Sequence, residues 1–340
     1  MAKNKKSTLI LILTLFILAA GCQSTEEKKV LKLAHGLDTS HPVHKAMVYM
    51  ADALKEKSGG KLTIQIYPSG QLGGERENVE LLQIGSLAMT KVSAAVMEGF
   101  APKFKVIGLP YIFKSKVHSY KVFDGEIGDD LLKSAEEFWL RGLTFYDAGS
   151  RSFYTKENPI RHPNDLQGLK IRVMKSNTAV NMVKAFGGSP TPITFGELYT
   201  ALQGGVVDGA ENNPPSFYLS HHYEVCKYYS LNEHSTIPDI LLISTHIWNS
   251  LSEQEQQWLQ EAADESAQVQ RKLWIESEEA SLDAVREAGV EVIYPDKEPF
   301  AKMVEPLYEE YKSEEDIYNL IKRIQAAEEL VKTDTVTPSL

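Results

Sequence analysis

The chain has 340 residues, with 36 lysines and arginines against 46 aspartates and glutamates, which gives a formal net charge of −10 at neutral pH. An acidic chain is a poor partner for nucleic acid or for an anionic membrane surface, so any positive charge that captures an anion has to be local. The length suits two domains better than a single core.

The amino terminus has the pattern of an export signal. Three lysines in the first six residues precede an apolar run at 9–20. This run is too short to span a bilayer as a stable helix, and its flanks are those of a secretory signal. We therefore predict a signal peptide at 1–21.

The sequence Leu-Ala-Ala-Gly-Cys that ends at Cys22 resembles a bacterial lipobox, in which the cysteine is acylated and becomes the first mature residue; Ala19 stands where leucine is more usual. A diacylated cysteine supplies the two chains that stable anchoring needs. We predict lipidation of Cys22 and a lipidated, polar tether at 22–29, with an ordinary soluble secretory signal as the alternative. Cys226 would then be the remaining cysteine, which excludes a disulfide framework.

The first third of the chain has an α/β pattern. Strand patterns at 30–34, 62–67 and 91–95 alternate with helix patterns at 44–58 and 74–84. This order predicts a parallel sheet whose ligand-facing loops follow the carboxyl ends of the strands.

A second stretch of the same kind begins with a strand pattern at 143–148. It continues through 170–173 (strand), 178–186 (helix), 191–193 (strand), 195–203 (helix) and 208–211 (strand). Residues 252–288 read as one mostly polar helix, long enough to brace two lobes. The residues from 329 onward have the composition of a loose tail.

Arg172 is the most informative residue of the second stretch. In the short strand Leu-Lys-Ile-Arg-Val it shares a face with Lys170, opposite Ile171 and Val173. A guanidinium at the end of a buried strand needs a planar anion for its fork of donors. That anion is either an internal carboxylate or an external ligand, and strand position alone does not choose between them.

The sequence lacks the motifs of nucleotide-binding and zinc-binding sites. The glycine-rich stretch at 70–74 lacks the lysine and hydroxyl of a phosphate-binding loop and the spacing of a dinucleotide turn. His35, His41 and His44 could hold zinc by composition, but their loop offers no cysteine or evident fourth ligand. We expect no metal and no cofactor. What remains is a binding set that consists of Arg172, Arg151, Asn212 or Asn213, Phe195, Glu75 and the His35 loop.

Five segments give the chain a specific resemblance: residues 67–76, 109–113, 165–173, 192–199 and 207–212. With these segments the chain resembles a solute-binding protein of the tripartite ATP-independent periplasmic (TRAP) transporters, the DctP family, of the type that binds sugar acids. The segments span nearly the whole mature chain in the order typical of the family.

The resemblance implies an α/β, two-lobed periplasmic-binding-protein fold with discontinuous lobes, hinge strands and a long helix spanning both lobes. Strand crossovers are expected near Gly149 and Ile237. The implied division is 30–149 plus 238–277 for lobe I, 150–237 plus 278–328 for lobe II, and 329–340 for a flexible tail.

The resemblance also implies roles for single residues. Arg172 would form a two-pronged salt bridge with the substrate carboxylate, Arg151 matches a second arginine, and Phe195 matches an aromatic wall. Asn212 matches an amide that binds the carboxylate or a hydroxyl. The additional Asn213 departs from the simpler Glu-Asn-Pro pattern and leaves open which amide reaches the ligand.

The side of the site that faces away from Arg172 is expected to be polar. Its candidates are His35, His44, Lys45, Glu75 and Ser93, and the resemblance places the last two at positions that contact sugar hydroxyls. Glu75 would accept hydrogen bonds from hydroxyls and repel a second carboxylate. We therefore expect a hexuronate, glucuronate or galacturonate, or a related sugar acid. Four-carbon dicarboxylates and sialic acid are the alternatives; Ser93 and Val96 stand where sialate binders tend to place charged side chains.

The function that follows is capture without chemistry: two lobes close on the acid and deliver it to the TRAP permease. We expect a monomer that does not bind nucleic acid. It would be held at the outer face of a bacterial membrane by its lipid anchor alone, or be periplasmic. A lyase or isomerase that uses the His35 loop is the enzyme alternative and would need a base within reach of a substrate proton and usually a metal. A chemoreceptor-type or structural lipoprotein is the third possibility.

Overall fold

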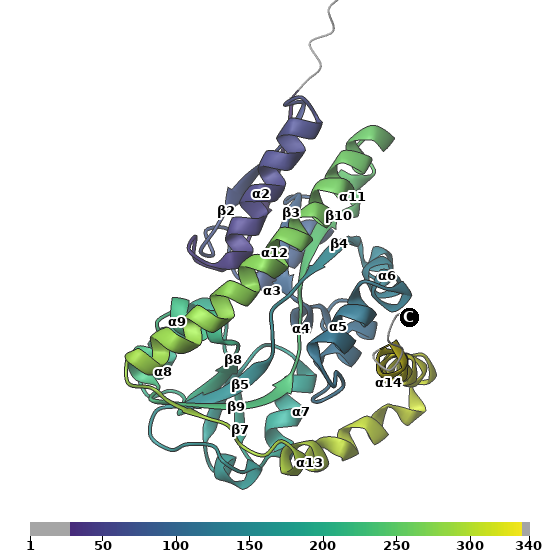
Figure 1. Cartoon of the computed structure of the whole chain (residues 1–340). Coiled ribbons are helices and arrows are strands. Elements are labelled where there is room, and N and C mark those ends of the chain that lie inside the picture. Colours follow the sequence, from purple (N-terminus) through teal and green to yellow (C-terminus); the bar gives the residue numbers. More distant parts are fainter. Residues whose placement is uncertain (1–27, 335–340) are drawn as a thin grey trace, which may run out of the picture.

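The computed structural model describes residues 28–334, and its ribbon forms two α/β lobes joined side by side (Figure 1). Cys22, the predicted lipidation site, lies outside this range, as does the predicted signal peptide. Lobe I holds a sheet in the order β2 (Leu62–Tyr67), β1 (Lys29–Ala34), β3 (Met89–Ser93), β10 (Asp239–Ser244), β4 (Leu140–Tyr146). The sheet of lobe II has the order β11 (Glu291–Ile293), β9 (Tyr228–Ser235), β5 (Arg151–Thr155), β8 (Gly209–Asn212), β6 (Lys170–Val173), β7 (Ser189–Pro192).

The parallel part of lobe I has the predicted order of strand, helix, strand, helix and strand. β1 pairs in parallel with β2 and β3, and the connections run through α2 (Pro42–Lys57) and α3 (Glu75–Gln83). α2 begins before the expected residue 44, because the His41 side chain accepts a hydrogen bond from Val43 N as N-cap and Pro42 suits the first helical position. β3 ends at Ser93, where α4 (Ala94–Met97) begins.

Two chain crossings connect the lobes. β4 in lobe I continues into β5 in lobe II, and β9 in lobe II continues into β10 in lobe I, so the crossings lie at 147–150 and 236–238. Both agree with the positions expected near Gly149 and Ile237. Gly149 has a φ of 57°, and a Cβ there would lie 2.7 Å from Glu278 Oε1, so the first crossing requires glycine.

The helix α12 (Glu253–Glu287) matches the predicted long helix. Ser252 and Glu255 form a capping box at its start. It packs against α2 and β4 of lobe I and against α9 (Pro214–Leu219) of lobe II. At 35 residues it spans both lobes in Figure 1, which makes it a brace across the crossings.

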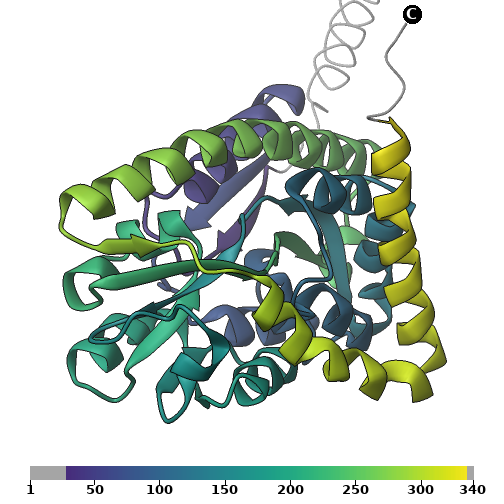
Figure 2. The ribbon, with the colours of Figure 1, turned by 60° about the horizontal axis from the view of Figure 1, so that its bottom comes forward.

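After α12 has carried the chain from lobe I to lobe II, the carboxyl-terminal segment returns to lobe I. α13 (Glu298–Glu309) buries Phe300 and Val304 in a lobe II core, whereas α14 (Glu315–Asp334) buries an apolar stripe in a lobe I core with Phe104 and Phe123. Figure 2 shows α14 (yellow) alongside the helices of lobe I. The predicted assignment of 278–328 to lobe II is therefore corrected for α14. The tail expected from residue 329 is corrected as well, because the helix continues to Asp334.

The remaining elements cover the faces of the sheets. The helices are α5 (Lys116–Phe123), α6 (Glu126–Ser134), α7 (Asn177–Ala185), α8 (Leu198–Gln203), α10 (His222–Val225) and α11 (Thr245–Trp248). The 3-10 turns are η1 (Pro102–Gly108), η2 (Glu136–Phe138), η3 (Pro163–Leu166), η4 (Phe195–Glu197) and η5 (Glu310–Ser313). Across 28–334, no helix combines the length with the apolar character that a bilayer span requires.

Candidate ligand-binding site

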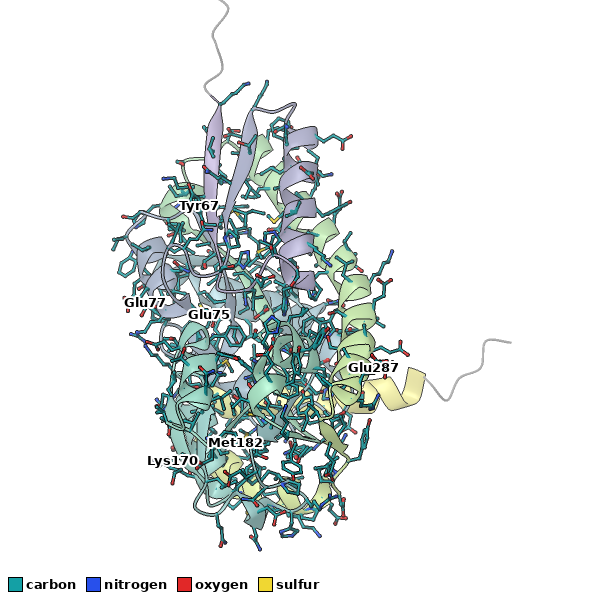
Figure 3. The ribbon with its side chains drawn as sticks, turned by 90° about the vertical axis from the view of Figure 1, so that its left-hand side faces the viewer. Tyr67, Glu75, Glu77, Lys170, Met182 and Glu287 are labelled. Atoms are coloured by element: carbon teal, nitrogen blue, oxygen red, sulfur yellow. The ribbon has the colours of Figure 1, made fainter. Side chains whose placement is uncertain are left out.

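A cavity of about 310 Å³ lies where the two lobes meet. Lobe I lines it with the loops after β1 and β2, the start of α3, and residues of β3 and β10. Lobe II contributes residues of β5, β6, β8 and η4, and α12 contributes Trp274. Figure 3 shows Glu75, one of the lining residues, between Tyr67 of lobe I and Lys170 of lobe II. Strand ends and helix starts from both lobes thus converge on one space, as binding sites of α/β sheets do.

Arg172 lines this cavity from β6 and is only 2% exposed. Its Nε donates to the Ile193 carbonyl oxygen at 2.8 Å, while Nη1 is buried and has no hydrogen-bond partner among residues 28–334. Burial lowers the pKa of Arg172 below its usual value, although a guanidinium stays charged. Within residues 28–334 Arg172 forms no ion pair with a carboxylate, so the internal-pair alternative left open by the sequence lacks its partner. A buried guanidinium in this state is poised for an anion from outside.

Arg151, by contrast, is already neutralised. It forms a two-pronged ion pair with Glu211, in which Nε pairs with Oε2 and Nη2 lies 2.9 Å from Oε1. Nη2 also donates to the Glu211 carbonyl oxygen, and Nη1 donates to Asn212 Oδ1, both at 2.8 Å. Burial opposes the charge on Glu211, but Arg151 and His234 hold the pKa of this carboxyl at about 2. Arg151 lines the cavity, yet most of its donors serve to position Glu211 and Asn212.

The two asparagines have different local tasks, and both line the cavity. Asn213 is the N-cap of α9, where its Oδ1 accepts from Ser216 N at 2.9 Å. Asn212 ends β8, and its Oδ1 accepts from Arg151 Nη1 and from Asn213 N. Since both acceptor bonds fall on Oδ1, the Nδ2 group of Asn212 has donors to spare for the cavity.

Phe195 lies at the start of η4 and also lines the cavity. It packs against the cores of both lobes, and its ring meets the His222 ring edge-on at a centroid distance of 5.7 Å. A side chain that contacts both lobes at once has this environment only when the lobes are close together. Phe195 is therefore a wall of the cavity as well as a contact between lobes.

The lobe I side of the cavity carries one buried lysine between two carboxylates. Lys91 Nζ lies 3.2 Å from Glu75 Oε1 and 3.1 Å from Asp239 Oδ1, and Ser93 N donates to the same Glu75 oxygen at 3.1 Å. Burial alone would lower the pKa of Lys91, but Asp239 and Glu75 raise it above its usual value. Burial also raises the pKa of Asp239, despite Lys91. This wall is rich in hydrogen-bond acceptors, which suits ligand hydroxyls.

Three of the predicted residues lie apart from the cavity lining. Lys45 is exposed on α2. His35 is fully buried, with Nε2 3.0 Å from His44 Nδ1 and with Nδ1 accepting from Leu37 N at 3.1 Å. The His35–His44 pair thus orders the loop after β1 instead of facing the cavity. No group of three or more His, Cys, Asp or Glu side chains in 28–334 is arranged to hold a metal, so the zinc alternative has no site in that range.

Cys226, the cysteine that remains after Cys22, has the environment of a small buried hydrophobic residue. It is fully buried in a lobe II core. Burial raises the pKa of its thiol to about 12, so at neutral pH it is an unreactive thiol.

The cavity lining also includes residues that the sequence did not single out, among them Lys91, Met174, Lys175, Trp274 and Asp239. It includes His41 as well, which belongs to the predicted His35 loop. Lys91 and Asp239 were detectable in principle, because a charge inside a buried strand requires a partner or a function. Trp274 lies in α12, and its position in the sequence does not indicate that it is part of the site. Only the packing of α12 across both lobes places it there.

The comparisons with known proteins agree with this geometry. Residues 33–314 match the DctP family, described as bacterial extracellular solute-binding protein, family 7. A TRAP periplasmic solute-binding protein of Bradyrhizobium sp. BTAi1, solved with galacturonate, is 40% identical with a TM-score of 0.86, covering 88% of this chain and 100% of that one. A TRAP protein of Anaerococcus prevotii, solved with D-glucuronate, is 38% identical with a TM-score of 0.87, covering 89% and 99%.

A characterised relative extends the agreement. The 2,3-diketo-L-gulonate-binding periplasmic protein YiaO of Escherichia coli is 32% identical over 281 residues, which are 82% of this chain and 86% of the relative. Together with the two-lobed fold, the crossings and the cavity at the lobe junction, these matches establish what kind of protein this is: the chain belongs to the DctP family of TRAP solute-binding proteins.

Proposed function

We propose that this protein captures a hexuronate, D-galacturonate or D-glucuronate, outside the cytoplasm and delivers it to a TRAP permease. The observation that carries the proposal is the buried Arg172, whose Nη1 has no partner beside a cavity of about 310 Å³. A carboxylate would occupy this guanidinium, and the hydroxyls of the same molecule would meet the acceptors of lobe I. The solved TRAP proteins of Bradyrhizobium and Anaerococcus, which hold galacturonate and glucuronate, support this class of ligand.

The contacts divide between the lobes. From lobe II, Arg172 and Asn212 Nδ2 donate to the carboxylate, while Arg151 holds Asn212 in place and Phe195 covers the ring. Glu75 and Ser93 of lobe I serve the hydroxyls. Asn213 serves mainly as the N-cap of α9 and is not a principal contact of the ligand. Because the ligand joins groups from both lobes, it favours the closed arrangement by its differential affinity.

The protein acts as a carrier and not as a catalyst in this proposal. The lobe I carboxylates are ion-paired with Lys91. His35 is fully buried outside the cavity lining, and His44 and Leu37 N engage its two ring nitrogens, so neither group is placed to take a proton from a ligand. We propose further that the protein works as a monomer, and that a lipid on Cys22 is its only anchor to the outer face of a bacterial membrane.

The proposal is tested by a ligand screen on the purified mature protein. A panel of hexuronates, aldonates, four-carbon dicarboxylates, keto acids and sialic acid is added, and the melting temperature is measured. Ligand at a hundredfold excess over its Kd stabilises the native state by about 2.7 kcal/mol, so a hexuronate should raise the melting temperature by several degrees. NMR of the incubated sugar should show it unchanged. No shift with any hexuronate would overturn the substrate class, and consumption of the sugar would overturn the carrier role.

The acidic wall should also decide between hexuronates and dicarboxylates. Glu75→Gln removes one negative charge from the lobe I side, so we expect the Kd ratio of succinate to hexuronate to fall by about tenfold, since like-charge repulsion of the second carboxylate is reduced. Isothermal titration calorimetry gives both constants. Glu80→Gln on the same helix, where Glu80 pairs with Arg76 at the surface, is the matched control and should leave the ratio unchanged. A preference for succinate in the parent protein would favour the dicarboxylate alternative instead.

A further inference from the structure

His41 is a buried titratable group of the cavity lining to which the proposed function assigns no ligand contact. It lies between the loop after β1 and the start of α2, is 3% exposed, and lines the cavity. Its Nε2 is buried and finds no hydrogen-bond partner in the described part of the chain. A buried polar atom in this state costs free energy unless a ligand or water satisfies it.

The fold determines which kind of partner Nε2 requires. His41 Nδ1 accepts a hydrogen bond from Val43 N at 3.3 Å as the N-cap of α2. A neutral imidazole that accepts at Nδ1 carries its proton at Nε2. Helix capping therefore fixes the tautomer, so that a residue of the cavity lining carries a buried N–H donor at Nε2.

The surroundings keep the imidazole neutral and in place. Burial lowers the pKa of His41 well below its usual value, and the positive charge of Lys91 and the nearby His35 and His44 act in the same direction, against Asp38. The ring packs against the Trp274 ring at a centroid distance of 5.9 Å, which restricts its rotation. His41 thus presents one oriented, uncharged N–H group.

We infer that His41 is a specificity-determining residue that donates a hydrogen bond from Nε2 to an uncharged oxygen of the bound sugar acid. This inference rests on the proposed function. It adds a donor to a lobe I wall that otherwise offers mainly the Glu75 and Asp239 carboxylates as acceptors. The ligand must then present an acceptor oxygen to His41 and donor hydroxyls to the carboxylates, a pattern that only a hydroxylated acid, and not a simple carboxylate, can satisfy.

Two substitutions separate the two nitrogens of His41. Asparagine places an acceptor near the Nδ1 position and keeps the cap, but it lacks a donor at the Nε2 position. Glutamine places an amide N–H near the Nε2 position but lacks the capping acceptor. His41→Asn should therefore keep the melting temperature of the unliganded protein and weaken hexuronate binding about tenfold. His41→Gln should lower the melting temperature and bind within about threefold of the parent protein.

The measurements are calorimetric Kd values for D-galacturonate and D-glucuronate at pH 6 to 8, with melting temperatures of the unliganded variants. The matched control is the same pair of substitutions at His162, which caps η3 away from the cavity and should leave both Kd values unchanged. If His41→Asn binds as tightly as the parent, or if both variants lose affinity equally, His41 acts only through loop structure and the inference is wrong.

The pH series adds a second criterion. A neutral donor predicts no loss of affinity from His41 titration between pH 6 and 8. A loss on raising the pH that disappears in His41→Asn would show a charged imidazole and overturn the inference. Absence of any hexuronate binding by the parent protein would instead overturn the proposed function, so the two failures are distinguishable.

Discussion

Replacement of Arg172 by methionine should abolish measurable hexuronate binding and leave the protein folded. The guanidinium is buried, donates to Ile193, and has no carboxylate partner within residues 28–334. Loss of one member of a buried, hydrogen-bonded charge pair costs about 2–5 kcal/mol of binding free energy, which corresponds to a loss of affinity of at least about thirtyfold. Methionine has a similar length without the charge, so the free protein also loses an uncompensated buried cation. Its melting temperature should therefore not fall substantially.

Calorimetry with the hexuronate identified in the screen measures this effect, and circular dichroism monitors the fold. Lys170→Met is the matched control, because Lys170 lies two residues earlier on β6 and is exposed; its Kd should equal that of the parent. Arg172→Lys keeps the charge but loses the planar fork, and should bind more weakly than the parent. Parent-like affinity of Arg172→Met would show that Arg172 is not the anchor.

Glu211→Gln should have the opposite consequence, a large loss of stability. Glu211 is the fully buried partner of Arg151, and its removal leaves that guanidinium without a countercharge. Breaking such a pair costs about 3–5 kcal/mol of the free energy of unfolding. Urea denaturation should show a lower midpoint at an unchanged slope. Glu291→Gln, which removes the exposed partner of Arg161, should change the midpoint little.

The pH dependence of stability provides a further check on the same group. The folded-state pKa of Glu211 is about 2, below the value near 4.3 expected in the unfolded chain. The unfolded state therefore binds the proton more readily, so the contribution of Glu211 to stability is present above about pH 4.3 and is lost as the pH falls through about 2. This part of the acid destabilisation should be absent in Glu211→Gln. Identical acid profiles of parent and variant would contradict the assignment.

Local patterns in the sequence were sufficient to predict strands in which apolar and polar residues alternate and helices that begin with capping residues. The strand–helix order of lobe I, the strand at 170–173 and the long helix follow from periodicity and from the Ser252 capping box. The strands β5 and β10 were missed because they are buried on both faces, so they lack the alternation that identifies a strand. The carboxyl-terminal helix α14 was assigned to the wrong lobe, because its apolar stripe shows that one face is buried but not in which core.

The site divides in the same way. Arg172, Arg151, Asn212, Asn213, Phe195, Glu75 and Ser93, all chosen from the sequence, line one cavity. His35, His44 and Lys45 do not line it: His35 and His44 interact with each other in and beside the loop after β1, and Lys45 is exposed on α2.

The sequence by itself determined the chemical character of the binding site: an arginine and an asparagine on short strands, and acids and glycines at loop positions, since these depend on residue type and short spacing. Tertiary structure alone decided which charges are already neutralised. Arg151 and Arg172 are both buried arginines on strands of the lobe II sheet. Glu211 forms an ion pair with Arg151, whereas Arg172 has no carboxylate partner within residues 28–334. That difference arises because burial and distance, not residue identity, determine whether a charge is satisfied within the fold or requires a ligand.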